Sequence, residues 1–157
     1  MEKEDKELLL KDLCSRQQYG VKLFAEGEDH PIELHYVKDE EIFSRVYQNL
    51  PYWVETVKPY LVSPSSLPAE DVLELGKMIG MAAAGLMNTR STDELFDPEP
   101  LQDLLEVCYK EHIDINGLIP KGLALEAPKD MYGAKKIMNY HSLMALTRTG
   151  NQRVINV

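Results

Sequence analysis

The chain has 157 residues, of which 44% are hydrophobic and 27% charged, and its formal net charge is −9. That length fits one domain with its own hydrophobic core, and the composition excludes a chain that is disordered along most of its length. The longest apolar run, Met78 to Met87, has ten residues, which is too short to cross a membrane.

The charge is distributed unevenly. Residues 1–130 contain all 26 acidic residues and 13 Lys or Arg, a net −13, whereas residues 131–157 contain four basic residues and no acid, a net +4. The acidic body argues against nucleic acid as a partner, because phosphate groups bind to positive surfaces. We predict a single domain over residues 1–132 and a basic C-terminal tail over residues 133–157. The charged N-terminus lacks the features of a signal peptide, so we expect a cytoplasmic protein.

The first predicted element is a helix that ends before Gly20. Four leucines and Cys14 lie on one side of residues 4–16, among Lys, Glu and Asp. Glycine suits the left-handed position that closes a helix, which is the role we assign to Gly20. We expect Cys14 and, further along the chain, Cys108 to be buried, because lone cysteines without a metal-binding spacing usually behave as small hydrophobic side chains.

Two short strands and a turn follow. Residues 21–26 and 32–37 alternate or are rich in aromatic residues, and Gly27 and Pro31 bound the polar stretch between them. This pattern predicts an antiparallel β-hairpin. Because an isolated hairpin is marginally stable in water, it must pack on a helix or on a further strand.

Residues 39–48 fit two structures. Ile42, Phe43, Val46 and Tyr47 have the spacing of one helix face, and we favour a helix on that ground. The same composition also allows a third strand. Residues 52–60 are expected to form a short helical turn or an extended piece.

Two long helices come next. Residues 65–71 have the residue types that begin a helix, and that helix is predicted to run to about Asn88. A further helix is predicted from Asp97 to about His112.

Small residues spaced by four form a smooth stripe on the first of these long helices, at Gly76, Gly80 and Ala84. Glycine in a helix interior costs about 1 kcal/mol relative to alanine. The stripe therefore predicts a closely approaching neighbour, either another helix of this chain or, in the alternative, a homodimer mate or a partner's helix.

Residues 112–132 are apolar but follow neither a helical nor a strand period. Gly117, Pro120, Gly122 and Pro128 punctuate them, which predicts an ordered, irregular segment packed on the core. Together the elements predict an α+β fold: a small antiparallel β-hairpin or sheet packed on three main helices, followed by this ordered irregular segment.

Two sequence blocks resemble a family of small uncharacterised proteins from gut bacteria and their prophages or mobile elements. Lys58-Pro-Tyr-Leu with Ser65-Ser-Leu is similar to the family's KPYL…SS(M/L) block, and residues 117–132 are similar to its GLIPxGLALEAPxxMY block. Residues 12–20 resemble its opening DLCARLPYG, with Gln17 and Gln18 in place of Leu-Pro. The likeness covers residues 11–132, and the tail departs from the pattern. The resemblance implies a shared fold and a phage or mobile-element origin, but no reaction.

The sequence carries no catalytic or metal-binding motif that we can identify. The four histidines lack HxxxH, HExxH or cysteine-paired spacings, and no GxSxG or SxxK motif is present. Gly76 and Gly80 lie inside a predicted helix rather than between a strand and a helix, so they do not form a phosphate-binding loop. We therefore expect no metal and no cofactor, and we favour a protein that is not an enzyme.

Two groups of residues are the candidate binding surface. Tyrosine and tryptophan combine a large apolar area with a polar tip and are enriched at interfaces. The chain has one such aromatic group, formed by Tyr47, Tyr52, Trp53 and Tyr60, and from it we select Tyr52, Trp53 and Tyr60 as candidates. The irregular segment adds three apolar residues: Leu118, Ile119 and Pro120. The alternative interpretation is that both groups close the core.

These observations predict a non-enzymatic protein-interaction module. A second hypothesis is a small enzyme or ligand binder with a pocket between the hairpin and the helices. A third is an acidic mimic of nucleic acid, which the net charge of −13 over residues 1–130 suggests.

Overall fold

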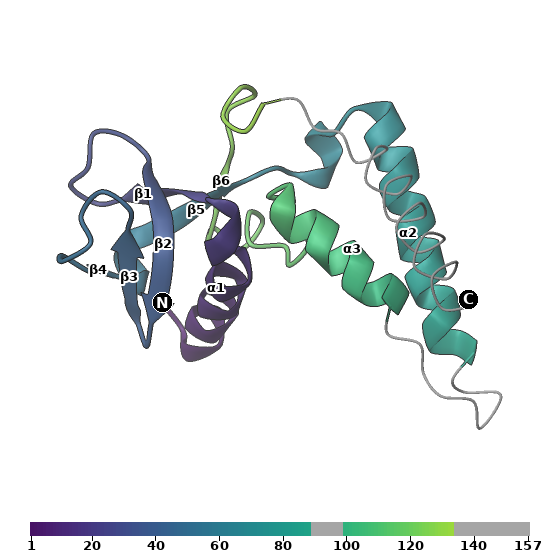
Figure 1. Ribbon diagram of the computed structural model, residues 1–157, viewed down its shortest axis with the longest axis horizontal. Helices are drawn as coiled ribbons and strands as arrows, with labels where there is room; N and C mark the ends of the chain where they lie inside the picture. The colour runs from purple at the N-terminus through teal and green to yellow at the C-terminus, as the bar shows by residue number, and fades with distance from the viewer. Residues whose placement is uncertain (89–98, 134–157) are drawn as a thin grey trace, which may run out of the picture. The chain divides into compact units, whose positions relative to one another are not determined.

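The computed structural model describes residues 1–88 and 99–133 and has an α+β fold (Figure 1). In this described part of the chain, three α-helices accompany a six-stranded, mostly antiparallel sheet with the strand order β4-β3-β2-β1-β5-β6. The predicted fold class is therefore confirmed.

The chain divides into two compact units. The first comprises residues 1–64 and 108–131, and the second comprises residues 65–107 and 132–157. The sheet and α1 belong to the first unit, whereas α2 and most of α3 belong to the second. The single domain over residues 1–132 stays a prediction.

Helix α1 (Lys3–Arg16) begins with Glu4 and Asp5 in its first turn, where acidic side chains complement the helix dipole. A 3-10 turn, η1 (Gln17–Tyr19), continues it and ends at Gly20, whose φ of 67° is left-handed. A Cβ at Gly20 would also lie 3.2 Å from Oε1 of Glu33. The predicted role of Gly20 at the helix end is confirmed.

The sheet begins with the predicted hairpin. Strand β1 (Lys22–Ala25) pairs antiparallel with β2 (Ile32–Lys38) and, on its other side, with β5 (Val57–Leu61). Strands β3 (Glu41–Ser44) and β4 (Tyr52–Trp53) extend the sheet beyond β2, and β6 (Leu125–Glu126) adds a parallel strand beside β5. A 3-10 turn, η2 (Val54–Thr56), connects β4 to β5, so residues 52–60 contain both of the structures that the sequence allowed.

The helix favoured for residues 39–48 is wrong, because Glu41–Ser44 form strand β3. Ile42 pairs with Val37 on one side and with Tyr52 on the other, and it is fully buried. Val46, which the helical spacing would place on the same buried face, is 73% exposed. Cross-strand pairing of Ile42 therefore determined the conformation of this segment, and the helical spacing of its apolar residues did not.

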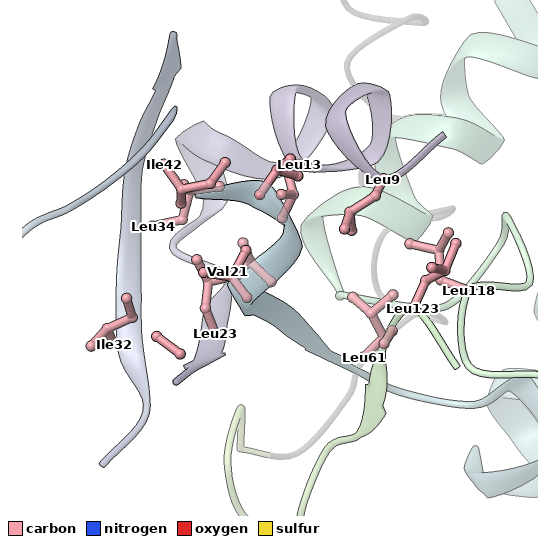
Figure 2. Packing of buried hydrophobic residues seen from close by; sticks show 14 residues of the cluster. Leu9, Leu13, Val21, Leu23, Ile32, Leu34, Ile42, Leu61, Leu118 and Leu123 are labelled. Carbon is pink, nitrogen blue, oxygen red and sulfur yellow. The ribbon is translucent and has the colours of Figure 1, made fainter. Parts of the chain in front are cut away.

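The core of the first unit lies between α1 and one face of the sheet. Leu9 and Leu13 project from α1 into a cluster of side chains from the strands and from the irregular segment (Figure 2). The cluster consists of buried residues from every part of this unit, namely Leu9, Leu13, Val21, Leu23, Ala25, Ile32, Leu34, Ile42, Val54, Val57, Leu61, Leu118, Leu123 and Ala124.

The irregular segment is ordered and packs on this core, as predicted. The Asp114 carboxylate accepts hydrogen bonds from the N–H groups of Leu118 (2.7 Å) and Ile119 (2.9 Å). The Leu123 N–H donates to the Leu118 carbonyl at 3.0 Å, and the Ala127 N–H donates to the Leu61 carbonyl at 2.7 Å. Several backbone groups of the segment thus have hydrogen-bond partners although it forms no long helix or strand.

The second unit contains α2 (Ala69–Asn88) and the greater part of α3 (Glu99–Lys110). The predicted start of α3 at Asp97 lies outside the described residues. Helix α2 buries Leu75, Met78 and Ala82, but Val72 and Ile79 are 47% and 46% exposed. Much of the apolar surface of α2 is therefore on its exposed side.

Cys108 is buried as predicted, but the prediction for Cys14 is wrong, because its side chain is exposed. Leu9 and Leu13 occupy the core-facing positions of α1, and Cys14, one residue after Leu13, points about 100° away from it. Both cysteines are free thiols. None of the helices in the described part of the chain combines the length and apolar composition needed to cross a membrane.

Candidate protein-contact surface

Strand pairing assigns each residue of the sheet to one of two faces, because directly opposed residues share a face. The inner face carries the core described above. The other, which we call the outer face, carries a mixture of aromatic and charged side chains: Lys22, Phe24, Glu33, Tyr36, Lys38, Glu41, Phe43, Trp53, Lys58 and Tyr60.

Tyr52 and Trp53 point to opposite faces of β4. Tyr52 is opposite Ile42, and it is partly buried against the core. Its hydroxyl donates a 2.6 Å hydrogen bond to the Glu28 carboxylate. Desolvation, together with the hydrogen bond to Glu28 and that carboxylate's charge, raises the pKa of Tyr52 to about 12. Tyr52 thus joins the core to the β1–β2 turn.

Trp53 is opposite Glu41 on the outer face and is 57% exposed. Three further large apolar side chains precede it in the β3–β4 connection: Val46 is 73% exposed, Tyr47 46% and Leu50 67%. The backbone between them is ordered by a 3.0 Å hydrogen bond from the Tyr47 N–H to Ser44 Oγ and a 3.2 Å bond from the Leu50 N–H to the Tyr47 carbonyl. We call Val46, Tyr47, Leu50 and Trp53 the hairpin patch, after the β3–β4 hairpin to which they belong.

Sequence reasoning included Tyr47 in the aromatic group but missed Val46 and Leu50 as surface residues, because it favoured a helix in which the spacing of these two residues implies burial. The signal that could have revealed them was the alternative strand over residues 42–47. A strand that ends at Ser44 leaves the next apolar residues in a connection.

Tyr60 is also on the outer face, but strands β3, β2 and β1 separate its strand, β5, from β4 in the sheet. It is half-buried, whereas Trp53 is exposed. The structure therefore does not bring Tyr52, Trp53 and Tyr60 together as one aromatic group.

The three candidates from the irregular segment differ in burial. Leu118 is fully buried in the core, Ile119 packs partly against the core, and Pro120 is exposed. Leu118 therefore holds the segment in place, and only Pro120 is freely accessible.

The small-residue stripe on α2 has no close neighbour in the described structure. Gly76, Gly80 and Ala84 are exposed. A Cβ built on Gly76 or Gly80 would meet no heavy atom within 4 Å. Close packing within residues 1–88 and 99–133 thus does not account for the two glycines.

Within residues 1–88 and 99–133, no three His, Cys, Asp or Glu side chains are grouped so that they could hold a metal ion. A scan against protein-family models and searches of curated proteins and of solved structures found no match to this chain. The surface chemistry of the chain itself is therefore the basis for assigning a function.

Proposed function

We propose that this protein is a non-enzymatic protein-interaction module that binds its partner through the hairpin patch. One observation carries the proposal: four large apolar side chains between residues 46 and 53 are 46–73% exposed. Keeping apolar surface in water costs roughly 25 cal/mol for each Å². Exposed apolar side chains that gather in one short segment therefore favour an interaction site over ordinary surface.

Trp53 is the expected anchor of this contact. Tryptophan is enriched among the few interface residues that carry most of the binding energy, and Trp53 presents more than half of its surface to solvent. Its position in β4 fixes the face from which it projects, and tryptophan has only two side-chain torsions, so little side-chain freedom is lost on binding. A cytoplasmic location and a phage or mobile-element origin both stay predictions, and the proposal depends on neither.

The first prediction is that Trp53→Ala weakens binding of the partner by roughly 30-fold or more, as the loss of a hot spot of about 2 kcal/mol would. The tagged protein and the variant are used to capture partners from a nuclease-treated lysate of the organism that encodes the chain. The captured protein is then purified, and its dissociation constant is measured with each form.

Leu73→Ala is the matched control, because Leu73 is 63% exposed but belongs to α2 and not to the hairpin patch. It should bind as the unaltered protein does. The free energy of unfolding of each variant should lie within about 0.5 kcal/mol of the value for the unaltered chain, as expected for surface substitutions. Equal loss of binding in both variants, or unchanged binding by Trp53→Ala, would contradict the proposal.

A second candidate function is self-association through α2, and the open stripe at Gly76 and Gly80 favours it. The exposed Val72 and Ile79 flank this stripe, so a second copy of the helix could approach closely and cover them. Such a contact is self-complementary, as a two-fold dimer requires.

The second prediction tests this dimer by sedimentation equilibrium. Gly80→Leu should weaken dimerisation, because its side chain would hold the two helices apart. If the unaltered protein is monomeric at every concentration, the dimer is excluded. In that case Gly80→Ala should simply stabilise the monomer by about 1 kcal/mol, since alanine favours the helix and the site is open.

A further inference from the structure

The outer face concentrates positive charge on an acidic protein. Its paired strands carry Lys22, Lys38 and Lys58 against Glu33 and Glu41. Arg45, directly after β3, adds a fourth cation, and its Nε lies 2.7 Å from Glu33. Four cations therefore face two carboxylates here, although the whole chain has a net charge of −9.

Glu33 is shared between two of these cations. Lys22 Nζ lies 2.7 Å from one Glu33 carboxylate oxygen, and Arg45 Nε lies 2.7 Å from the other. The Arg45 side chain is 53% exposed, so this cation remains accessible from solvent. Lys38 is exposed and is paired across the sheet with Glu41.

Aromatic rings lie next to this charge. Tyr36 and Phe43 are opposed on neighbouring strands, and their rings are stacked with centroids 4.4 Å apart and an interplanar angle of 9°. That separation is close to the 4.7–4.9 Å spacing of the strands. The two ring planes therefore lie roughly perpendicular to the direction that joins the strands. The rings present their edges, rather than their faces, to a molecule lying on the sheet.

Ring edges are the electropositive part of an aromatic side chain. They attract carboxylate oxygens and also accept apolar groups. A nucleic-acid base, by contrast, binds a protein aromatic ring by lying flat on its face. Each ring is stacked on one face of the other ring, so this pair is poorly arranged for base stacking.

We propose that the outer face of β2, β3 and β4 binds an acidic, apolar segment of the partner protein. Apolar side chains of that segment contact Trp53 and the edges of the Tyr36 and Phe43 rings, and its carboxylates contact the exposed cations Lys38 and Arg45. The inference rests on the proposed function and names the chemistry of the partner for the same surface, since Trp53 belongs to both the hairpin patch and the outer face.

Selection from a library of random dodecapeptides displayed on phage tests the inference without a known partner. The selected peptides should be enriched in Asp and Glu together with aromatic or aliphatic residues. Synthetic copies should bind about tenfold more weakly to Lys38→Glu, and binding should fall as salt is raised. Lys3→Glu is the control with the same change of charge, because Lys3 is exposed on α1.

Three results would overturn the inference: no peptide bound above background, selected peptides without an acidic bias, or equal weakening by Lys38→Glu and Lys3→Glu. A labelled oligothymidylate that binds in place of the peptides would also overturn it and assign the face to single-stranded nucleic acid. A different result distinguishes failure of this inference from failure of the proposed function. A partner that is lost with Trp53→Ala but indifferent to Lys38→Glu would retain the interaction module and reject only the acidic segment.

Discussion

Tyr52 shows how one side chain can belong to the core while its neighbour belongs to the surface. Its ring packs against the core beside Ile42, and its hydroxyl reaches Glu28 in the β1–β2 turn. Trp53, one residue later, points to the other face because successive strand residues alternate. The adjacent aromatic residues thus have different roles, and substitutions should separate them.

The third prediction concerns the pH dependence that Tyr52 introduces. Its pKa in the folded protein is about 12, above the ordinary value of 10, because of desolvation first and then Glu28. Because the pKa is raised in the folded protein, the protonated Tyr52 side chain contributes its full stabilisation below about pH 10. This contribution is lost as the pH rises from about 10 towards 12. Tyr52→Phe should lower stability at neutral pH by about 1 kcal/mol through the lost hydrogen bond.

Ultraviolet titration of tyrosine ionisation provides the measurement. The titration of the unaltered protein should include a late tyrosine ionisation, and Tyr52→Phe should remove that late step. Urea unfolding at a series of pH values should show a smaller fall in stability above pH 10 for the variant. A late step that persists in Tyr52→Phe would show that another tyrosine is responsible.

At the scale of elements, a buried arginine of α1 forms an ion pair within its own helix and hydrogen bonds to the backbone at the end of α3. Arg16 and Asp12 are one helical turn apart, their side chains are fully buried, and Arg16 Nε lies 2.7 Å from an Asp12 carboxylate oxygen. Arg16 also donates to the carbonyls of Ile113 (2.8 Å) and Cys108 (3.3 Å). Each buried charge thus has several partners, which offsets the cost of removing it from water.

The fourth prediction is that Arg16→Met destabilises the protein by roughly 3–5 kcal/mol, because it leaves the Asp12 carboxylate buried without its cation. Urea unfolding measures the change. The control, Lys3→Met, removes an exposed ion pair with Glu7 (3.7 Å) and should cost less than about 1 kcal/mol.

The double variant Asp12→Leu with Arg16→Met distinguishes the ion pair from simple packing. It should recover part of the lost stability, since it removes the isolated carboxylate as well. If the single variant Arg16→Met is as stable as the unaltered protein, the pair does not hold these elements together.

At the scale of the first unit, the chain returns to its starting core after α3. Leu118 is fully buried in the cluster that contains Leu9 and Leu13 of α1, and β6 pairs with β5. Leu118 lies more than 100 positions after both of these leucines, and Leu125 of β6 lies 65 positions after its partner Tyr60 in β5. Folding of this unit therefore requires both ends of the described chain.

The fifth prediction is that Leu118→Ala destabilises the protein by about 2–5 kcal/mol, as the loss of a buried leucine usually does. The neighbouring exposed Pro120→Ala should change stability by less than about 0.5 kcal/mol. Chemical unfolding of both variants is the measurement. If Leu118→Ala instead keeps full stability and loses partner binding, Leu118 is a contact residue, as the sequence alone suggested.

The sequence by itself determined the elements whose signals are local. Glycine at position 20 fits the left-handed helix end, alternation along residues 21–37 predicts the hairpin, and the punctuated apolar run at 117–128 predicts an ordered segment. Only the tertiary structure decided the elements whose burial depends on distant residues. Ile42 became a strand residue because Val37 and Tyr52 pair with it, and Val46, Tyr47 and Leu50 were consequently left exposed. A spacing pattern shows which side chains could share a face, but the neighbours that fold against that face determine whether it is core or surface.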